Sequence, residues 1–142
     1  MRRTGTARPS LFLMELVVAL LFFALAAAVC LRLFLAAWRI SEDSQALSQA
    51  TLLTQSAAEC FKAAGGDLQG TAELFGAPVS EDVVTTFYDG SWRPSVAWKA
   101  KYILTVRRTG EQGRLISGLV DVRGQGGVPV FSLEVSAWGE EP

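Results

Sequence analysis

Residues 11–31 read LFLMELVVALLFFALAAAVCL, and this apolar run decides the fold of the chain. Twenty of its twenty-one residues are uncharged, and most of them are aliphatic or phenylalanine. A helix of about 20 such residues spans the hydrocarbon core of a bilayer. The sequence therefore predicts a single membrane-spanning helical segment, which we place at residues 11–39.

The charges on the two sides of this run differ in sign. Residues 1–40 carry five Arg and one acid, whereas residues 41–142 carry eight basic and thirteen acidic residues. Cytoplasmic flanks of membrane helices are rich in Lys and Arg, so Arg2, Arg3 and Arg8 predict a cytoplasmic N-terminus and an extracytoplasmic body. A net acidic body argues against direct nucleic-acid binding, because that relies on Lys and Arg facing phosphates.

The composition also limits the chemistry. The chain contains no His, which excludes Ser-His-Asp and Cys-His catalysis and His-containing zinc sites. On one helix Cys30 and Cys60 would lie about 45 Å apart, too far for a disulfide. Residues 124–127 are glycine-rich but join two predicted strands, which indicates a hairpin turn and not a phosphate loop. We therefore expect no enzymatic activity, metal, cofactor or small-molecule substrate.

Glu15 is the one charged residue within the apolar run. A carboxylate at bilayer depth costs on the order of 2.5–3.5 kcal/mol on insertion scales, and less near an interface. Either Glu15 lies at the interface without a role, or it has a cationic partner in an assembly. Three processing routes remain open for this N-terminus: a secretory signal cut near residues 26–28, a lipoprotein signal cut before Cys30, or a cut before the apolar run.

The third route matches a known pattern. Residues 10–18, SLFLMELVV, resemble the N-terminal motif of type IV pilins and type II secretion pseudopilins, in which a basic leader precedes a cleavage site and an acid follows inside an apolar helix. The family usually has Gly before the cut and Phe after it, where this chain has Ser10 and Leu11. The resemblance covers roughly residues 8–40 and points to a minor or divergent member.

The resemblance implies a set of roles for particular residues. A prepilin peptidase would remove residues 1–10 by cutting between Ser10 and Leu11, and the new N-terminus on Leu11 would be N-methylated. Glu15 would then pair with the N-terminal amine of a neighbouring pilin-like subunit during assembly. The other implied partners are the membrane and the assembly machinery, and the head would reach the periplasm or the cell surface.

The rest of the chain predicts an α+β fold without reference to any family. From residue 11 to residue 64 there is neither Pro nor Gly, which predicts one helix of about 80 Å or two helices broken near residues 39–43. Residues 40–64 form its amphipathic, extracytoplasmic part and end at Gly65-Gly66. The apolar stripe consists of Ile40, Leu47, Ala50, Leu53 or Thr54, Ala57, Phe61 and Ala64.

Residues 65–142 predict a loop followed by an antiparallel sheet of three or four strands. Residues 67–82 lack a strand pattern and predict a loop, with a short helix at residues 71–75 as an alternative. Residues 83–88 are β-branched and aromatic. Apolar and polar residues then alternate over residues 98–107, 116–123 and 131–137, with turns at residues 110–113 and 124–129. The apolar face of this sheet needs a cover, and we expect the stripe of residues 40–64 to provide it in one globular head.

These two lines of inference lead to the same expectation, a minor pilin or pseudopilin with a pilin-like fold. Such a protein is a non-enzymatic subunit of a type IV pilus, a competence filament or a type II secretion-like filament. The alternative is a plain signal-anchored, single-pass protein whose extracytoplasmic domain binds a ligand or regulates a partner.

Overall fold

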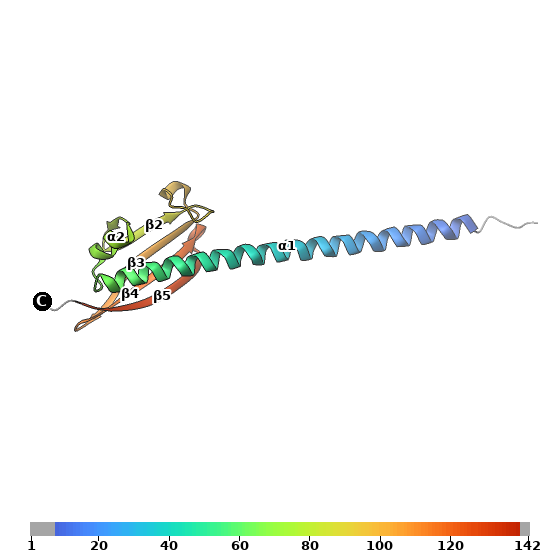
Figure 1. Ribbon diagram of the computed structural model, residues 1–142. Coiled ribbons are helices and arrows are strands. Elements are labelled where there is room, and N and C mark those ends of the chain that lie inside the picture. Colours follow the sequence, from blue (N-terminus) through green and yellow to red (C-terminus); the bar gives the residue numbers. More distant parts are fainter. Residues whose placement is uncertain (1–7, 140–142) are drawn as a thin grey trace, which may run out of the picture. The chain divides into compact units, whose positions relative to one another are not determined.

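The computed structural model describes residues 8–139, with side chains described from Ser10 onward (Figure 1). The chain divides into two compact units, Met1–Asp43 and Ser44–Pro142. We call the first the N-terminal unit and the second the head, and we describe each by itself. The leader residues 1–7, including Arg2 and Arg3, lie outside the described residues.

Helix α1 (Arg8–Ala63) supplies the described part of the N-terminal unit and the first element of the head. It is a single helix of 56 residues, without the alternative break near residues 39–43. Gly65 and Gly66 follow it with φ of 61° and 82°, and the Gly66 amide donates to the Phe61 carbonyl at 2.9 Å. Glycine adopts these left-handed angles without a side-chain clash, so the helix ends at the predicted place.

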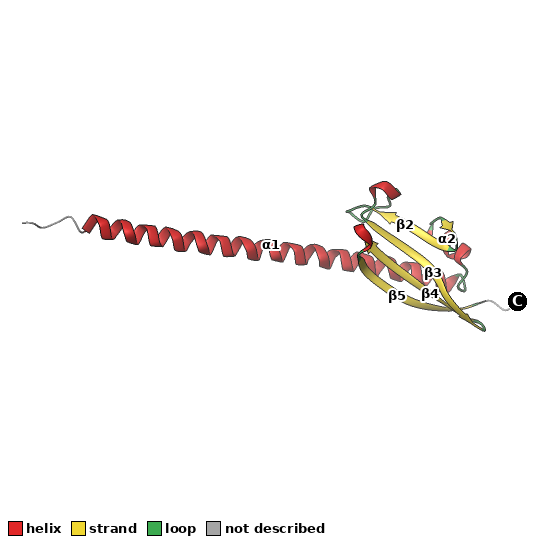
Figure 2. Cartoon of the chain, turned by 180° about the vertical axis from the view of Figure 1, so that it is seen from behind, coloured by secondary structure: helices red, strands yellow, loops and turns green. Residues whose placement is uncertain are grey.

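The head contains one antiparallel sheet with strands in sequence order β1-β2-β3-β4-β5 (Figure 2). The strands are β1 (Val79–Ser80), β2 (Val83–Tyr88), β3 (Tyr102–Gln112), β4 (Leu115–Gly124) and β5 (Pro129–Trp138). The prediction of three or four strands was wrong, because β1 also pairs with β2, at the edge of the sheet. A strand of two residues is too short to show an alternating pattern.

Two further differences from the prediction lie in the connections. The predicted loop contains helix α2 (Leu68–Phe75), which includes the alternative short helix at residues 71–75 but begins three residues earlier. Its N-cap residue Asp67 accepts a hydrogen bond from the Gly70 amide at 2.7 Å. Strand β3 extends to Gln112, into the predicted turn at residues 110–113, so the turn itself begins at Gly113. The register shifts between Arg108 and Gly110. Such a β-bulge absorbs one residue and lets the ladder continue.

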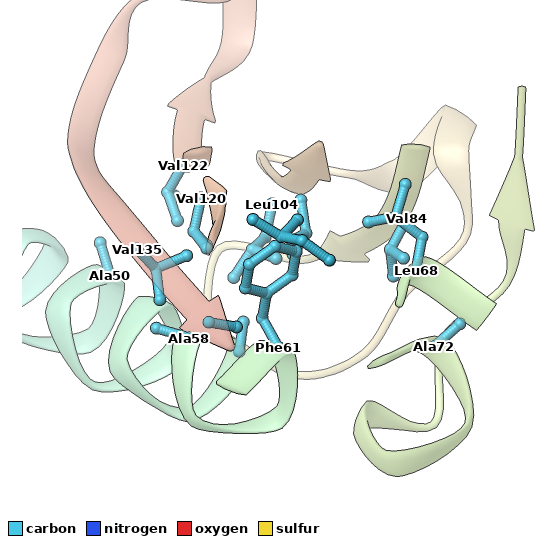
Figure 3. Close-up of a cluster of buried hydrophobic side chains, with 14 of the residues drawn as sticks. Ala50, Ala58, Phe61, Leu68, Ala72, Val84, Leu104, Val120, Val122 and Val135 are labelled. Atoms are coloured by element: carbon cyan, nitrogen blue, oxygen red, sulfur yellow. The ribbon is translucent and has the colours of Figure 1, made fainter. Parts of the chain in front are cut away.

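The core of the head lies between α1 and one face of the sheet (Figure 3). Phe61 of α1 is fully buried, and its ring lies over Gly118 of β4, where an added Cβ would stand 2.8 Å from the Phe61 Cζ. The helix contributes mostly small residues to this contact, so its backbone approaches the sheet closely. The fully buried side chains are Ala50, Thr54, Ala57 and Phe61 from α1, Thr71 from α2, and Val84, Leu104, Val106, Val120 and Val122 from the strands.

The expected cover of the sheet by the amphipathic part of α1 is therefore present, although it begins later than predicted. Within the head the buried stripe starts at Ala50, whereas Leu47 is 47% exposed. Ile40 belongs to the N-terminal unit, where it is exposed.

Candidate functional site

The N-terminal unit presents an apolar helical surface without any protein cover. From Leu11 to Ile40 its large apolar side chains are 46–75% exposed, and no residue of its most apolar stretch is buried. Within the described residues this is the one helix long and apolar enough to cross a membrane. A soluble protein would not leave so many adjacent apolar residues in water, so this surface is suited to lipid or to other apolar helices.

Glu15 lies on this surface as an isolated carboxylate. Its side chain is exposed, and no described residue forms an ion pair or hydrogen bond with it. In water this would be unremarkable, but in an apolar environment an unpaired carboxylate is expensive. Any partner for Glu15 must therefore come from lipid headgroups, from the residues before Arg8 or from another molecule.

Ser10 and Leu11 lie in the first turns of α1, and both are exposed. The predicted cleavage bond between them is therefore in helical backbone. Leu11 precedes Glu15 by four residues, so the two share one helix face. A cut before Leu11 would place a free amine one turn from the carboxylate of the same chain and at a similar depth in any membrane.

The outer face of the sheet, opposite α1, carries several charged residues of the strands, among them Arg107, Asp121 and Arg123. Asp121 lies on this face but is only 6% exposed. Thr105 Oγ1 donates to its Oδ1 at 2.8 Å, and Arg123 Nε donates to its Oδ2 at 2.6 Å. Both carboxylate oxygens are therefore engaged, which makes Asp121 a structural acceptor and not a free catalytic acid.

The basic residues around β3 separate into two groups that the sequence could not distinguish. Arg108 donates to the Gly66 carbonyl at 3.0 Å, and so ties β3 to the turn after α1. Lys101 and Arg107 instead line a groove of about 490 Å³ on the outer face, together with Arg123, Asp121 and the β4–β5 connection. Arg123 lies on β4, and the pairing of β4 with β3 brings it beside these residues.

The aromatic residues also separate into buried and exposed members. Trp92 stacks on Tyr102 with ring centroids 4.0 Å apart and packs against the core. Trp98 and Trp138 are 81% and 72% exposed, and Trp98 lies in the 3-10 turn η1 (Ala97–Lys99) instead of a strand. The predicted strand alternation from residue 98 therefore begins at Tyr102.

No arrangement for metal binding is seen in residues 8–139, where no three Cys, Asp or Glu side chains are grouped closely enough to hold an ion. The cysteines Cys30 and Cys60 are both free thiols, as expected. The described residues therefore present two surfaces of interest. One is the apolar helix with Glu15, and the other is the outer face of the head, with the groove lined by Lys101, Arg107 and Arg123.

No protein-family model, curated protein or solved structure matches the chain. The assignment of a function therefore rests on the residues and on their geometry.

Proposed function

We propose that this chain is a minor pilin or pseudopilin, a single-pass and non-enzymatic subunit of a type IV pilus, competence or type II secretion-like filament. The observation that supports this best is the isolated Glu15 on a fully exposed apolar helix. A plain membrane anchor has no use for a carboxylate at this depth, whereas a bundle of identical apolar helices needs a polar contact to set its register.

The proposed sequence of events begins with insertion of α1 in the cytoplasmic membrane, with the N-terminus inside. A prepilin peptidase then cuts between Ser10 and Leu11, and the new amine on Leu11 is methylated. This cationic amine pairs with Glu15 of a neighbouring subunit when the helices bundle. An ion pair in low dielectric adds little net stability, but leaving either partner alone costs several kcal/mol, so the pair selects one register.

The head fits the same proposal. Its α1 residues are buried against the sheet, while the α1 residues of the N-terminal unit remain without a protein partner. A subunit of this kind has one part that folds alone and one part that requires lipid or other subunits. After assembly the head would face the periplasm or the cell surface.

Substitution of Glu15 tests the proposed pairing. We expect Glu15→Ala chains to insert in the membrane normally, because removing a charge from an apolar helix favours insertion. Their co-purification with other pilin-like subunits after mild cross-linking in native membranes should fall about tenfold or more, the equivalent of 1.4 kcal/mol. Glu15→Asp should give an intermediate result, because it keeps the charge but has a shorter reach.

Glu42→Ala is the matched control, since Glu42 is an exposed acid of the same helix outside the apolar run. It should leave co-purification unchanged. Equal recovery of partners by the wild-type and Glu15→Ala chains would refute the pairing and would favour the plain signal-anchored protein.

A further inference from the structure

Positive charge in the head is concentrated in two stretches of sequence. Residues 90–110 contain five basic residues and no acid, and residues 122–133 contain one basic residue and no acid. These stretches hold six of the eight basic residues that follow residue 40, in a region that is net acidic. The six are Arg93, Lys99, Lys101, Arg107, Arg108 and Arg123.

The fold brings the ends of both stretches together. Tyr102, the first residue of β3, pairs with Gly124, the last residue of β4. The β2–β3 connection (residues 89–101) and the β4–β5 connection (residues 125–128) therefore lie at the same end of the sheet, and both line the groove of the outer face. We call these two connections the loop pair.

The loop pair also exposes apolar side chains. Trp98 is 81% exposed, Val128 62% and Val96 43%. One exposed apolar residue on a surface is ordinary, but three of them beside Lys99 and Lys101 form a mixed apolar and cationic surface.

The exposure of Trp98 is not a consequence of a poorly ordered loop. The Lys101 amide donates to the Tyr88 carbonyl at 2.8 Å, and the Ser95 amide donates to the Phe87 carbonyl at 2.8 Å. Trp92, from the same connection, stacks on Tyr102 and packs against the core. The connection is therefore held in place by Trp92, while Trp98 is left in solvent without a role in packing.

The loop pair lies at the end of the head where the chain enters it. Gly66, after the end of α1, lies against Ile116, and Phe61 lies over Gly118. Going back along α1 toward Ser44, the helix therefore follows β4 toward Gly124, and both views of the ribbon agree (Figures 1 and 2). Ser44 follows the N-terminal unit directly in the chain.

We propose that the loop pair binds the surface of an anionic bilayer, with Trp98 and Val96 in the interface and with Lys99 and Lys101 at the lipid headgroups. Trp is enriched at membrane interfaces, and Lys and Arg near an anionic surface are attracted to it. An acidic protein would also attract the cations. A bilayer is favoured because the apolar helix tethers the head beside it, at a high effective concentration.

This inference rests on the membrane insertion assumed in the proposed function, but not on filament assembly. It can be tested on the full chain alone, reconstituted in vesicles of phosphatidylcholine with or without phosphatidylglycerol. In a Cys30→Ser, Cys60→Ser background, Ala97→Cys carries an environment-sensitive fluorophore in the loop pair. Glu111→Cys carries it at the β3–β4 hairpin, the opposite end of the sheet. Quenching by headgroup-labelled lipid is then measured at each position.

We expect severalfold stronger quenching at residue 97 than at residue 111, and only when phosphatidylglycerol is present. Lys99→Glu with Lys101→Glu should abolish the difference, and added salt should weaken it, because it screens exposed charges. Trp98→Ala should reduce the difference. Trp138→Ala, which removes another largely exposed Trp at the far end of β5, should not.

Equal quenching at residues 97 and 111, or none at residue 97 in chains that float with the vesicles, would overturn the lipid assignment and point to an acidic protein partner. That outcome would leave the filament proposal intact, since the vesicles contain no other subunit. Loss of partners by Glu15→Ala chains, conversely, has no bearing on the quenching. Near-ultraviolet circular dichroism, through the Trp92 and Tyr102 stack, checks that each variant remains folded.

Discussion

Helix α1 passes through both units of this chain, and its two parts differ in what their side chains contact. In the N-terminal unit the large apolar residues are exposed on all sides of the helix. In the head the same helix buries Ala50, Thr54, Ala57 and Phe61 against the sheet. The backbone conformation is identical, so the difference lies in the side chains alone.

The two parts of α1 are suited to different environments because their side chains differ. In the head, small residues and one large ring allow a close approach to a sheet, and polar residues on the other faces meet water. In the N-terminal unit, bulky residues surround the helix and leave no face suited to water. The head therefore carries its own apolar partner, whereas the surface of the N-terminal unit is suited to lipid or to another apolar helix.

The largest effect is expected from placing a charge in the contact between α1 and the sheet. Phe61→Asp should unfold the head, because burying an unpaired carboxylate costs several kcal/mol and the ring over Gly118 is lost. Loss of the near-ultraviolet dichroism and rapid proteolysis of the head would show this. Leu52→Asp is the control, because Leu52 of the same helix is 61% exposed, and it should remain folded.

Replacing a Phe by Ala in each part of α1 tests whether the two parts lie in different environments. Phe61→Ala should lower the free energy of unfolding of the head by about 3–5 kcal/mol, the usual cost for a buried Phe. Phe22→Ala should leave the denaturation midpoint of the head unchanged, since Phe22 is 72% exposed in the N-terminal unit. Similar destabilisation by both variants, measured by urea denaturation in detergent, would contradict the separation of the two environments.

Gly118 tests the fit of the contact from the side of the sheet. Its added Cβ would stand 2.8 Å from the Phe61 ring, so Gly118→Ala should destabilise the head by about 1–3 kcal/mol through overpacking. Gly110→Ala on the neighbouring strand β3 is the control, because no atom lies within 4 Å of its added Cβ. The thermal unfolding midpoint of the Gly118→Ala variant should lie clearly below that of the Gly110→Ala variant. Equal midpoints would mean that the Phe61 ring does not rest on Gly118.

The smallest effect concerns Asp89, at the base of the loop pair. The backbone amides of Arg93 and Ser91 donate to its carboxylate and lower the pKa of Asp89 from its ordinary value of 3.8. Because the folded pKa is the lower one, this contribution to stability is present above about pH 4 and disappears as the pH falls through the folded value. Asp89→Asn should therefore lower the stability of the head slightly at neutral pH and leave it nearly unchanged at acid pH, where the wild-type carboxyl is protonated. Urea denaturation of both proteins over a series of pH values would check this.

The features of the fold that the sequence predicted are those with long, regular patterns. The absence of Gly and Pro over residues 11–64 identified the helix, and Gly65-Gly66 identified its end. The alternation in the last three strands identified an antiparallel sheet with one face to cover. Phe61 was expected on the covering stripe, and it is the fully buried ring of the core.

The features that it missed depend on short or nonlocal contacts. Strand β1 has two residues, and pairing with β2 alone defines it. Trp98 continues an alternating pattern in sequence, yet the turn η1 removes it from the strand. Arg123 joins Lys101 and Arg107 only because β4 lies beside β3. The roles predicted for Ser10, Leu11 and Glu15 concern other molecules, and they remain predictions.

The mature N-terminus is the most direct test of the central claim that this chain is a pilin-like subunit. Intact-mass measurement and N-terminal sequencing of protein extracted from its native membranes would identify it. If the chain is a pilin-like subunit, the extracted protein should begin at Leu11, lack residues 1–10 and carry one additional methyl group. A chain that retains residues 1–10, or one that begins at Val29 or Cys30, would contradict it.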